Sequence, residues 1–362
     1  MTTADVLKAL STVNDPDLKK DLVSLNMVKD VRVEGDKVSF SVVLTTPACP
    51  LKEMIRKDCE KAIQMIATPQ TQLTITMTSS VTTARENAPQ LQGVKNIIAI
   101  ASGKGGVGKS TVTTNLAVAL ARAGAKVGLI DADIFGPSIP VMFNCEKDQP
   151  EVTVVNGKNV IMPLEQYGVK LMSIGFLAPP DSAVVWRGPM ASSALKQFIG
   201  DTQWGELDYL FIDLPPGTSD IHLTLVQTVP VTGAVIVTTP QKIALADATK
   251  GLVMFQQPQI NVPVLGVVEN MAYFTPEELP SNKYYIFGKD GGKNLAEKYN
   301  VPFLGQIPLV QSIRESGDSG LPAVMKDGIT ATAFTNLAES LARQIAIRNA
   351  TFASTRKVEL TQ

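Results

Sequence analysis

The chain has 362 residues, of which 44% are hydrophobic and 19% are charged, and its formal net charge is −1. This composition is that of an ordinary globular protein, and the length predicts two domains or one large α/β domain. A net charge so close to zero provides no global basic field, which argues against a nucleic acid partner and against recruitment to an anionic membrane.

The cysteines and the N-terminus are typical of a cytoplasmic protein. Cys49, Cys59 and Cys145 are odd in number and widely spaced, which argues against a disulfide framework and for a reducing compartment. The chain begins without the basic segment and apolar core of a signal peptide. No window reaches the roughly 18 apolar residues of a membrane helix, so we expect no stable membrane association.

Residues 1–78 predict a small α+β domain. Its expected helices and strands are Ala4–Leu10, Val28–Val33, Lys37–Leu44, Leu51–Ile66 and Gln72–Thr78. The second helix places apolar residues at i, i+4 spacing on one face. Residues 79–93 are rich in Ser, Thr, Asn and Gln and predict a linker.

Residues 94–349 predict a P-loop domain of the α/β class, built on a doubly wound, mostly parallel sheet. Continuous apolar runs alternate with helical stretches, which is typical of strands covered on both faces. The expected strands are Ile97–Ser102, Val127–Asp131, Leu207–Asp213, Ala234–Thr239, Val264–Glu269 and Pro302–Ile307. Ligands of such sheets bind beyond the carboxyl ends of the strands. Residues 350–362 are expected to form a polar tail.

A phosphate-binding loop follows the first of these strands and precedes a helix, which is the context that such a motif requires. The residues expected to bind a nucleoside triphosphate are Gly103, Lys104, Gly105, Gly106, Val107, Gly108, Lys109, Ser110 and Thr111. The glycines let main-chain N–H groups surround phosphate oxygens. Lys109 is expected to pair with the β- and γ-phosphates, and the Ser110 hydroxyl to bind Mg²⁺.

Three carboxylates end neighbouring apolar runs and are expected to serve phosphoryl transfer. Asp213 stands where P-loop folds place a second Mg²⁺ group, which acts through a bound water. Asp131 and Asp133 can bind metal, orient a water or cap the next turn; we prefer Asp133 for aligning the attacking water and Asp131 for the outer shell of Mg²⁺. The one histidine, His222, argues against histidine-dependent triads and is expected at the surface.

The segment Lys104-Gly-Gly-Val-Gly-Lys-Ser110 resembles the deviant Walker A ATPases of the MinD/ParA type. In that family the first lysine reaches across a nucleotide-sandwich homodimer to the phosphates of the partner. The resemblance therefore implies a homodimer in which Lys104, Lys109 and Asp133 carry the catalysis.

Within that group the chain resembles the Mrp/ApbC iron–sulfur carrier ATPases. The similar stretches are Asp131–Ser138, Trp186–Met190, Asp213–Asp220, Thr238–Gln241 and Glu269–Phe274. The resemblance implies ATP, Mg²⁺ and a 4Fe-4S cluster as ligands, iron–sulfur assembly factors and apoproteins as partners, and Asn270 at the adenine edge. Residues 1–78 resemble the small iron–sulfur-assembly domain fused to such ATPases, whose hallmark is a cysteine in the context Thr45-Thr-Pro-Ala-Cys-Pro-Leu51.

One departure from the family concerns the cluster itself. Thr275–Ser281 stands where family members usually have a Cys-x-x-Cys pair, and its Glu277 and Glu278 are poor replacements for thiolates. Cys59 is expected in the core, whereas Cys145 can be exposed. Cys49 precedes a helix, whose N-terminus would lower the pKa of the thiol, and a dimer would bring two copies of it together.

Three functions compete. The first is an ATP-hydrolysing carrier that transfers iron–sulfur clusters to apoproteins, with Cys49 as the candidate ligand. The second is a nucleotide-gated dimeric scaffold that carries no cluster, which the missing cysteine pair favours. The third, a positioning ATPase at a membrane or on DNA, requires a basic amphipathic helix. Ala331–Arg348 provides only two arginines, so we rank this function last.

Overall fold

The structure is a computed structural model that describes residues 1–155, 157–177, 188–276, 278–279 and 281–359. Residues 1–79, here the N-terminal domain, form a three-stranded sheet in the order β3–β4–β5 and a separate pair of two-residue strands, β1 and β2. Two helices pack on this sheet and bury Ile55, Cys59 and Ile63 against it. The elements are α1 (Thr3–Leu10), β1 (Asn14–Asp15), β2 (Lys20–Asp21), β3 (Val28–Glu34), β4 (Lys37–Leu44), α2 (Lys52–Gln64) and β5 (Gln72–Ser79).

Residues 94–359, here the large domain, are built on an eight-stranded sheet in the order β10–β11–β7–β12–β6–β13–β14–β15. Only the edge strand β10 runs antiparallel to its neighbour, which confirms the predicted doubly wound, mostly parallel architecture. The strands are β6 (Val94–Ser102), β7 (Val127–Asp131), β10 (Leu164–Gln166), β11 (Val169–Ser173), β12 (Leu207–Asp213), β13 (Gly233–Thr238), β14 (Val264–Glu269) and β15 (Phe303–Gln306).

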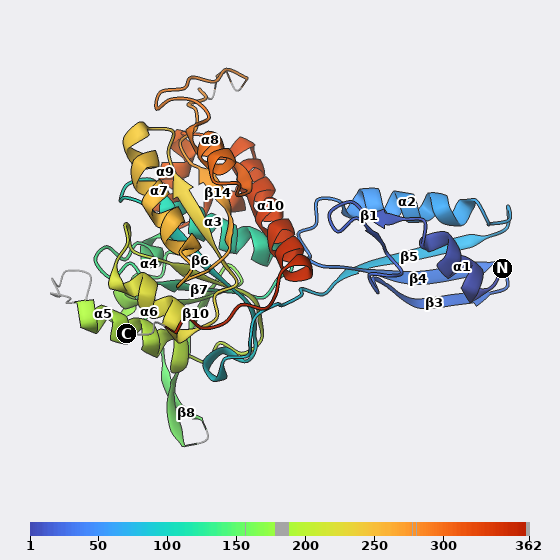
Figure 1. The fold of residues 1–362 in the computed structure, drawn as a ribbon, viewed down its shortest axis with the longest axis horizontal. Coiled ribbons are helices and arrows are strands. Elements are labelled where there is room, and N and C mark those ends of the chain that lie inside the picture. The colour runs from blue at the N-terminus through green and yellow to red at the C-terminus, as the bar shows by residue number, and fades with distance from the viewer. Residues whose placement is uncertain (156, 178–187, 277, 280, 360–362) are drawn as a thin grey trace.

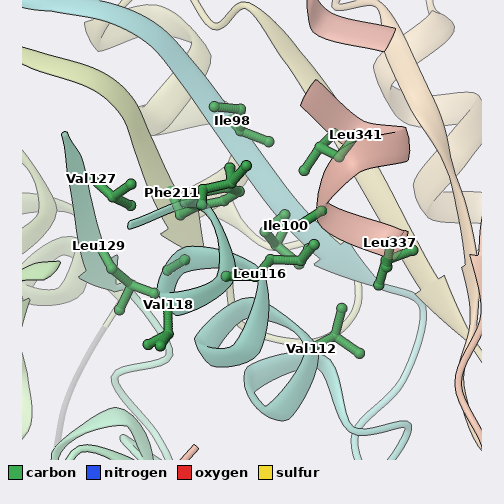
Figure 2. Close-up of a cluster of buried hydrophobic side chains, with 14 of the residues drawn as sticks. Ile98, Ile100, Val112, Leu116, Val118, Val127, Leu129, Phe211, Leu337 and Leu341 are labelled. Carbon is green, nitrogen blue, oxygen red and sulfur yellow. The ribbon is translucent and has the colours of Figure 1, made fainter. Parts of the chain in front are cut away.

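Helices cover both faces of the large sheet. On one face Ile98 and Ile100 of β6 pack against α3 and α10, as Figure 2 shows. Alternate residues of the same strand, Ile97 and Ala99, face the other helical layer. The helices are α3 (Lys109–Arg122), α4 (Ile139–Met142), α5 (Gly188–Gly200), α6 (Asp220–Thr228), α7 (Lys242–Gln256), α8 (Gly291–Lys298), α9 (Gln311–Asp318) and α10 (Ile329–Thr351).

A two-stranded hairpin, β8 (Val152–Val155) and β9 (Lys158–Ile161), projects from the large domain (Figure 1). The sequence analysis did not predict this hairpin or the strands β10 and β11. Each of the four strands has at most five residues, and such short runs carry little periodicity.

The segment expected to be a linker is fixed to the large domain. The buried guanidinium of Arg85 donates to the carbonyl oxygen of Val94 at 2.9 Å, and Arg85 also pairs with Thr355 in an isolated bridge. Arg348 of α10 donates to the carbonyl oxygen of Ala84. Helix α10 continues to Thr351, and the chain after it pairs with the linker at Thr355; the division of the chain into a linker and a polar tail stays a prediction.

Candidate functional site

The predicted phosphate-binding loop lies between the end of β6 and the start of α3. Gly106 and Gly108 have φ angles of 79° and 80°, in the left-handed region that glycine favours, and the loop curls around a pocket. This pocket is lined by Ser102, Lys104, Gly105, Gly106, Val107, Gly108, Lys109, Ser110, Thr111, Asp133, Ser138, Met142 and Pro216. The first turn of α3 points its N–H groups at the same space, as an anion site requires.

Close neighbours leave no room for a side chain at two glycines of the loop. A Cβ atom on Gly103 would lie 2.0 Å from the main chain of Asp247 in α7. A Cβ atom on Gly108 would lie 2.2 Å from the side-chain nitrogen of Asn270, which donates to the carbonyl oxygen of Val107 at 2.8 Å. Asn270 therefore holds the loop itself, while its expected place at the adenine edge stays a prediction.

Asp213 is the centre of the charged network beside the loop. It is fully buried at the end of β12, and its Oδ2 accepts hydrogen bonds from Lys109 Nζ at 2.7 Å and from Ser110 Oγ at 2.6 Å. Its Oδ1 accepts from the hydroxyl of Thr113 at 2.6 Å. The sequence analysis missed Thr113, although its position one turn after Lys109 on α3 places it on the same helix face.

Asp131 orders the loop after β7. Its buried carboxylate accepts hydrogen bonds from Ser173 Oγ at 3.0 Å and from the main-chain N–H groups of Asp133 and Ile139. Burial and the nearby charge of Asp213 raise the pKa of Asp131 to about 7, although Lys109 opposes the shift. Asp131 is thus occupied in holding the loop, and its role in the outer shell of Mg²⁺ stays a prediction.

Asp133 and Lys104 both line the pocket, and they differ in their partners. An Asp133 oxygen lies 3.8 Å from the ammonium group of Lys109, and burial raises the pKa of Asp133. The Lys104 side chain is partly exposed, and within the described part of the chain it forms no ion pair, whereas Lys109 forms two. A partly exposed cation at the mouth of a phosphate pocket is free to meet a charge from outside the protomer.

His222 is not at the surface, contrary to the expectation. It lies in the first turn of α6 and is only 1% exposed. Its Nδ1 accepts from the N–H of Ser219, which completes a cap on the helix, and burial lowers its pKa to about 4. A neutral, buried capping histidine explains the residue without a catalytic role.

The three cysteines lie in different environments. Cys59 is fully buried, as expected for the core, but Cys145 is also buried at 4% exposure, which corrects the expectation of an exposed thiol. Cys49 alone is partly exposed. Burial raises its pKa, with smaller contributions from the charges of Asp15 and Asp17, and outweighs the main-chain hydrogen bond of Leu51, which lowers it. The expected net lowering by the helix N-terminus is therefore wrong.

Cys49 lies at the end of the sheet opposite the phosphate pocket. The neighbouring Thr46 contacts the hydroxyl of Tyr209 at 3.2 Å, near the start of β12, whereas Asp213 ends that strand. Four residues of strand span about 13 Å. Cys49 and the phosphate pocket therefore lie toward opposite ends of β12, and the expectation that a dimer brings two copies of Cys49 together stays a prediction.

Two segments named from the sequence lie partly outside the described residues. They are the similar stretch Trp186–Met190, which loses Trp186 and Arg187, and the departing stretch Thr275–Ser281, which loses Glu277 and Pro280. Over the part of the chain that is described, no helix combines the length and the hydrophobicity needed to cross a bilayer.

Comparisons with known proteins agree with this geometry. The family described as NUBPL iron-transfer P-loop NTPase (ParA) matches residues 93–345, and the family described as iron–sulfur cluster assembly protein matches residues 3–79. The iron–sulfur cluster carrier protein of Synechocystis is 48% identical over 352 residues, covering 96% of this chain and 99% of its own length.

Two further relatives extend the comparison. The iron–sulfur cluster carrier protein of Escherichia coli is 45% identical over 324 residues, covering 89% of this chain and 86% of its own. A solved structure, the nucleotide-binding protein of Archaeoglobus fulgidus in complex with ADP, is 41% identical with a TM-score of 0.57, covering 66% of this chain and 91% of that one.

Proposed function

Because the chain belongs to the NUBPL iron-transfer P-loop NTPase family, we propose that it is an ATP-hydrolysing carrier that passes iron–sulfur clusters to apoproteins, acting as a cytoplasmic homodimer. The observation that carries the proposal is one chain that combines a phosphate pocket with an assembly-type domain bearing a partly exposed thiol. The relatives named as cluster carriers share both parts, since the similarity spans nearly the whole chain.

The nucleotide is held by the loop and by Lys109. Lys109 and Ser110 both donate to Asp213, and with ATP bound Lys109 would pair with the β- and γ-phosphates. The hydroxyl of Ser110 and the carboxylate of Asp213 are hard oxygen donors, which fit Mg²⁺. When bound, Mg²⁺ would neutralise charge on the transferred phosphoryl group.

Hydrolysis needs an oriented water and one more cation. Asp133 lines the pocket beside Lys109 and would orient the attacking water, for which position matters more than basicity. Lys104 would reach the phosphates of the partner protomer, where it would stabilise the charge that grows in the transition state. Each site would thus be complete only in the dimer.

The cluster is the cargo, and Cys49 is the residue placed to bind it. Iron–sulfur clusters are held by thiolates, and Cys59 and Cys145 are buried in cores. One thiol per chain leaves coordination positions open for thiolates of an assembly factor or of an apoprotein. Such partial ligation suits a carrier, because the cargo must leave.

Anaerobic reconstitution with ferrous iron and sulfide tests the proposal. The intact chain is expected to gain iron, sulfide and the visible absorption of a cluster, and Cys49→Ser is expected to lose most of this uptake. Cys145→Ala is the matched control, since its thiol is buried, and it should load like the intact chain. Equal loading of the Cys49→Ser variant, or no loading of any variant, would remove the carrier and favour the nucleotide-gated scaffold.

A further inference from the structure

The loop that carries Cys49 is docked on the large domain. Thr46 is 2% exposed, and its hydroxyl meets that of Tyr209, which is itself 1% exposed. Ala48 packs into the hydrophobic core of the large domain rather than into the core of its own domain. The thiol between these contacts and α2 therefore lies at a domain interface.

A charge pair closes the interface beside the thiol. Nε of Arg343 in α10 donates to Oδ1 of Asp17 at 2.6 Å. The turn that presents Asp17 is fixed by the buried Asp15, whose carboxylate accepts the N–H groups of Asp17 and Leu18 at 2.9 Å. Both acids, Arg343 and Cys49 line one narrow pocket, whose remaining wall includes Ala346 and Ile347 of α10.

The docking contacts are few. The side chains described above supply one hydrogen bond, one buried alanine and one ion pair that is partly open to solvent. The two domains otherwise have separate cores, and in Figure 1 the N-terminal domain extends away from the end of α10. Small, polar interfaces between domains permit relative motion, so the docked loop can open without unfolding either core.

We propose that the docked arrangement is a closed state that shields the Cys49 thiol, and that the Asp17–Arg343 pair is the latch that holds it closed. The proposal deepens the proposed function, on which it rests for the role of the thiol as the cargo ligand. In the closed state a partner thiolate cannot approach Cys49 freely; breaking the latch presents the loop at the surface of the N-terminal domain.

Alkylation of the native full chain with iodoacetamide, quantified separately at each cysteine by mass spectrometry, tests the latch without any cluster. Arg343→Gln is expected to alkylate Cys49 about fivefold faster than wild type, the factor that corresponds to losing an exposed ion pair. The direction is diagnostic: removal of a nearby cation alone disfavours the thiolate and would slow the reaction. Opening of the interface makes it faster, and the hydrogen exchange of residues 45–50 separates this opening from a mere widening of the pocket by the shorter side chain.

Two controls isolate the effect. Arg314→Gln removes another surface arginine that pairs with Asp318 and should leave the Cys49 rate unchanged. Cys59 and Cys145 report unfolding, because both react only if a core opens. As a second measurement, hydrogen exchange of residues 45–50 should accelerate in Arg343→Gln while the amides of β12 stay protected.

An unchanged or slower Cys49 rate in Arg343→Gln would overturn the latch, as would unchanged exchange in residues 45–50. These outcomes are independent of the carrier proposal, which fails only through cluster uptake. Cluster uptake without a faster Cys49 reaction in Arg343→Gln would contradict only the latch. A faster Cys49 reaction without cluster uptake would contradict only the carrier.

Discussion

The two ends of the strands in the large sheet carry different kinds of site. At the carboxyl ends, Lys109, Asp131 and Asp213 are buried and linked to one another or to the surrounding main chain. At the amino ends, Cys49 lies between two domains, with one charge pair and one hydroxyl contact beside it. The first site is built into the core of one domain, whereas the second depends on how two domains meet.

This difference shows how one chain can separate energy use from cargo handling. Under the proposed function, the phosphate pocket needs one more cation from outside the protomer. The thiol site needs further ligands and an open interface. Since the two are joined through β12, which contacts Thr46 near its start and ends in Asp213, a change at one end has a short path to the other.

The largest expected effect comes from Lys104→Ala. If Lys104 acts on the phosphates of a partner, kcat for ATP should fall by about 10³-fold, the lower range for such trans-acting cations, while ATP affinity is retained. Lys109→Ala should instead weaken ATP binding, because its lysine contacts the phosphates in the same protomer. Equilibrium nucleotide binding and steady-state hydrolysis measured on both variants distinguish these effects.

The same hydrolysis measurement also compares the carboxyl and amino ends of the strands in the large sheet. Lys126→Ala, an exposed lysine just before β7 at the amino end, is the matched control and should keep full activity. Cluster uptake at Cys49 should be unaffected by Lys104→Ala. A wild-type protein that hydrolyses ATP at full rate as a monomer would contradict the role of Lys104.

The contrast also explains what the sequence could and could not predict. The strands that end in Asp131 and Asp213 were predicted with their observed bounds, because continuous apolar runs, glycines and carboxylates are local signals. The surroundings of Cys49 were not predicted, because Arg343 and Tyr209, which contact the neighbouring Asp17 and Thr46, are distant in the sequence. Burial also reversed the expected pKa shift of Cys49.

The next effect is the pH dependence of stability caused by Asp131. Its pKa is 3.8 in the reference state and about 7 in the fold, so the folded state binds the proton more tightly. Between about pH 4 and pH 7, rising pH therefore destabilises the nucleotide-free protein. In Asp131→Asn this contribution is absent.

Urea unfolding at pH 5 and pH 8 measures this effect. The Asn variant loses hydrogen bonds from Ser173 and Ile139 and should be less stable than wild type at pH 5. The difference in unfolding free energy between wild type and the Asn variant should narrow by about 3 kcal/mol at pH 8, since the favourable protonation is lost over about two pH units at about 1.4 kcal/mol each. If the difference in unfolding free energy between the two proteins is the same at both pH values, the carboxyl group of Asp131 does not have a raised pKa in the fold.

The smallest effect concerns Thr113, whose hydroxyl orients Asp213 through Oδ1. Thr113→Val keeps the shape of the fully buried side chain but removes the donor, and kcat is expected to fall about tenfold, as for the loss of one hydrogen bond to a charged group. The Mg²⁺ concentration needed for half-maximal activity should rise, while the KM for ATP changes little. Thr113→Ser, which keeps the hydroxyl and loses the methyl group, should restore most of the rate. If Thr113→Ser is as impaired as Thr113→Val, packing of the methyl group against the core matters more than the hydroxyl. The phosphate site would then depend less on hydrogen bonds, and the contrast with the Cys49 interface would be weaker.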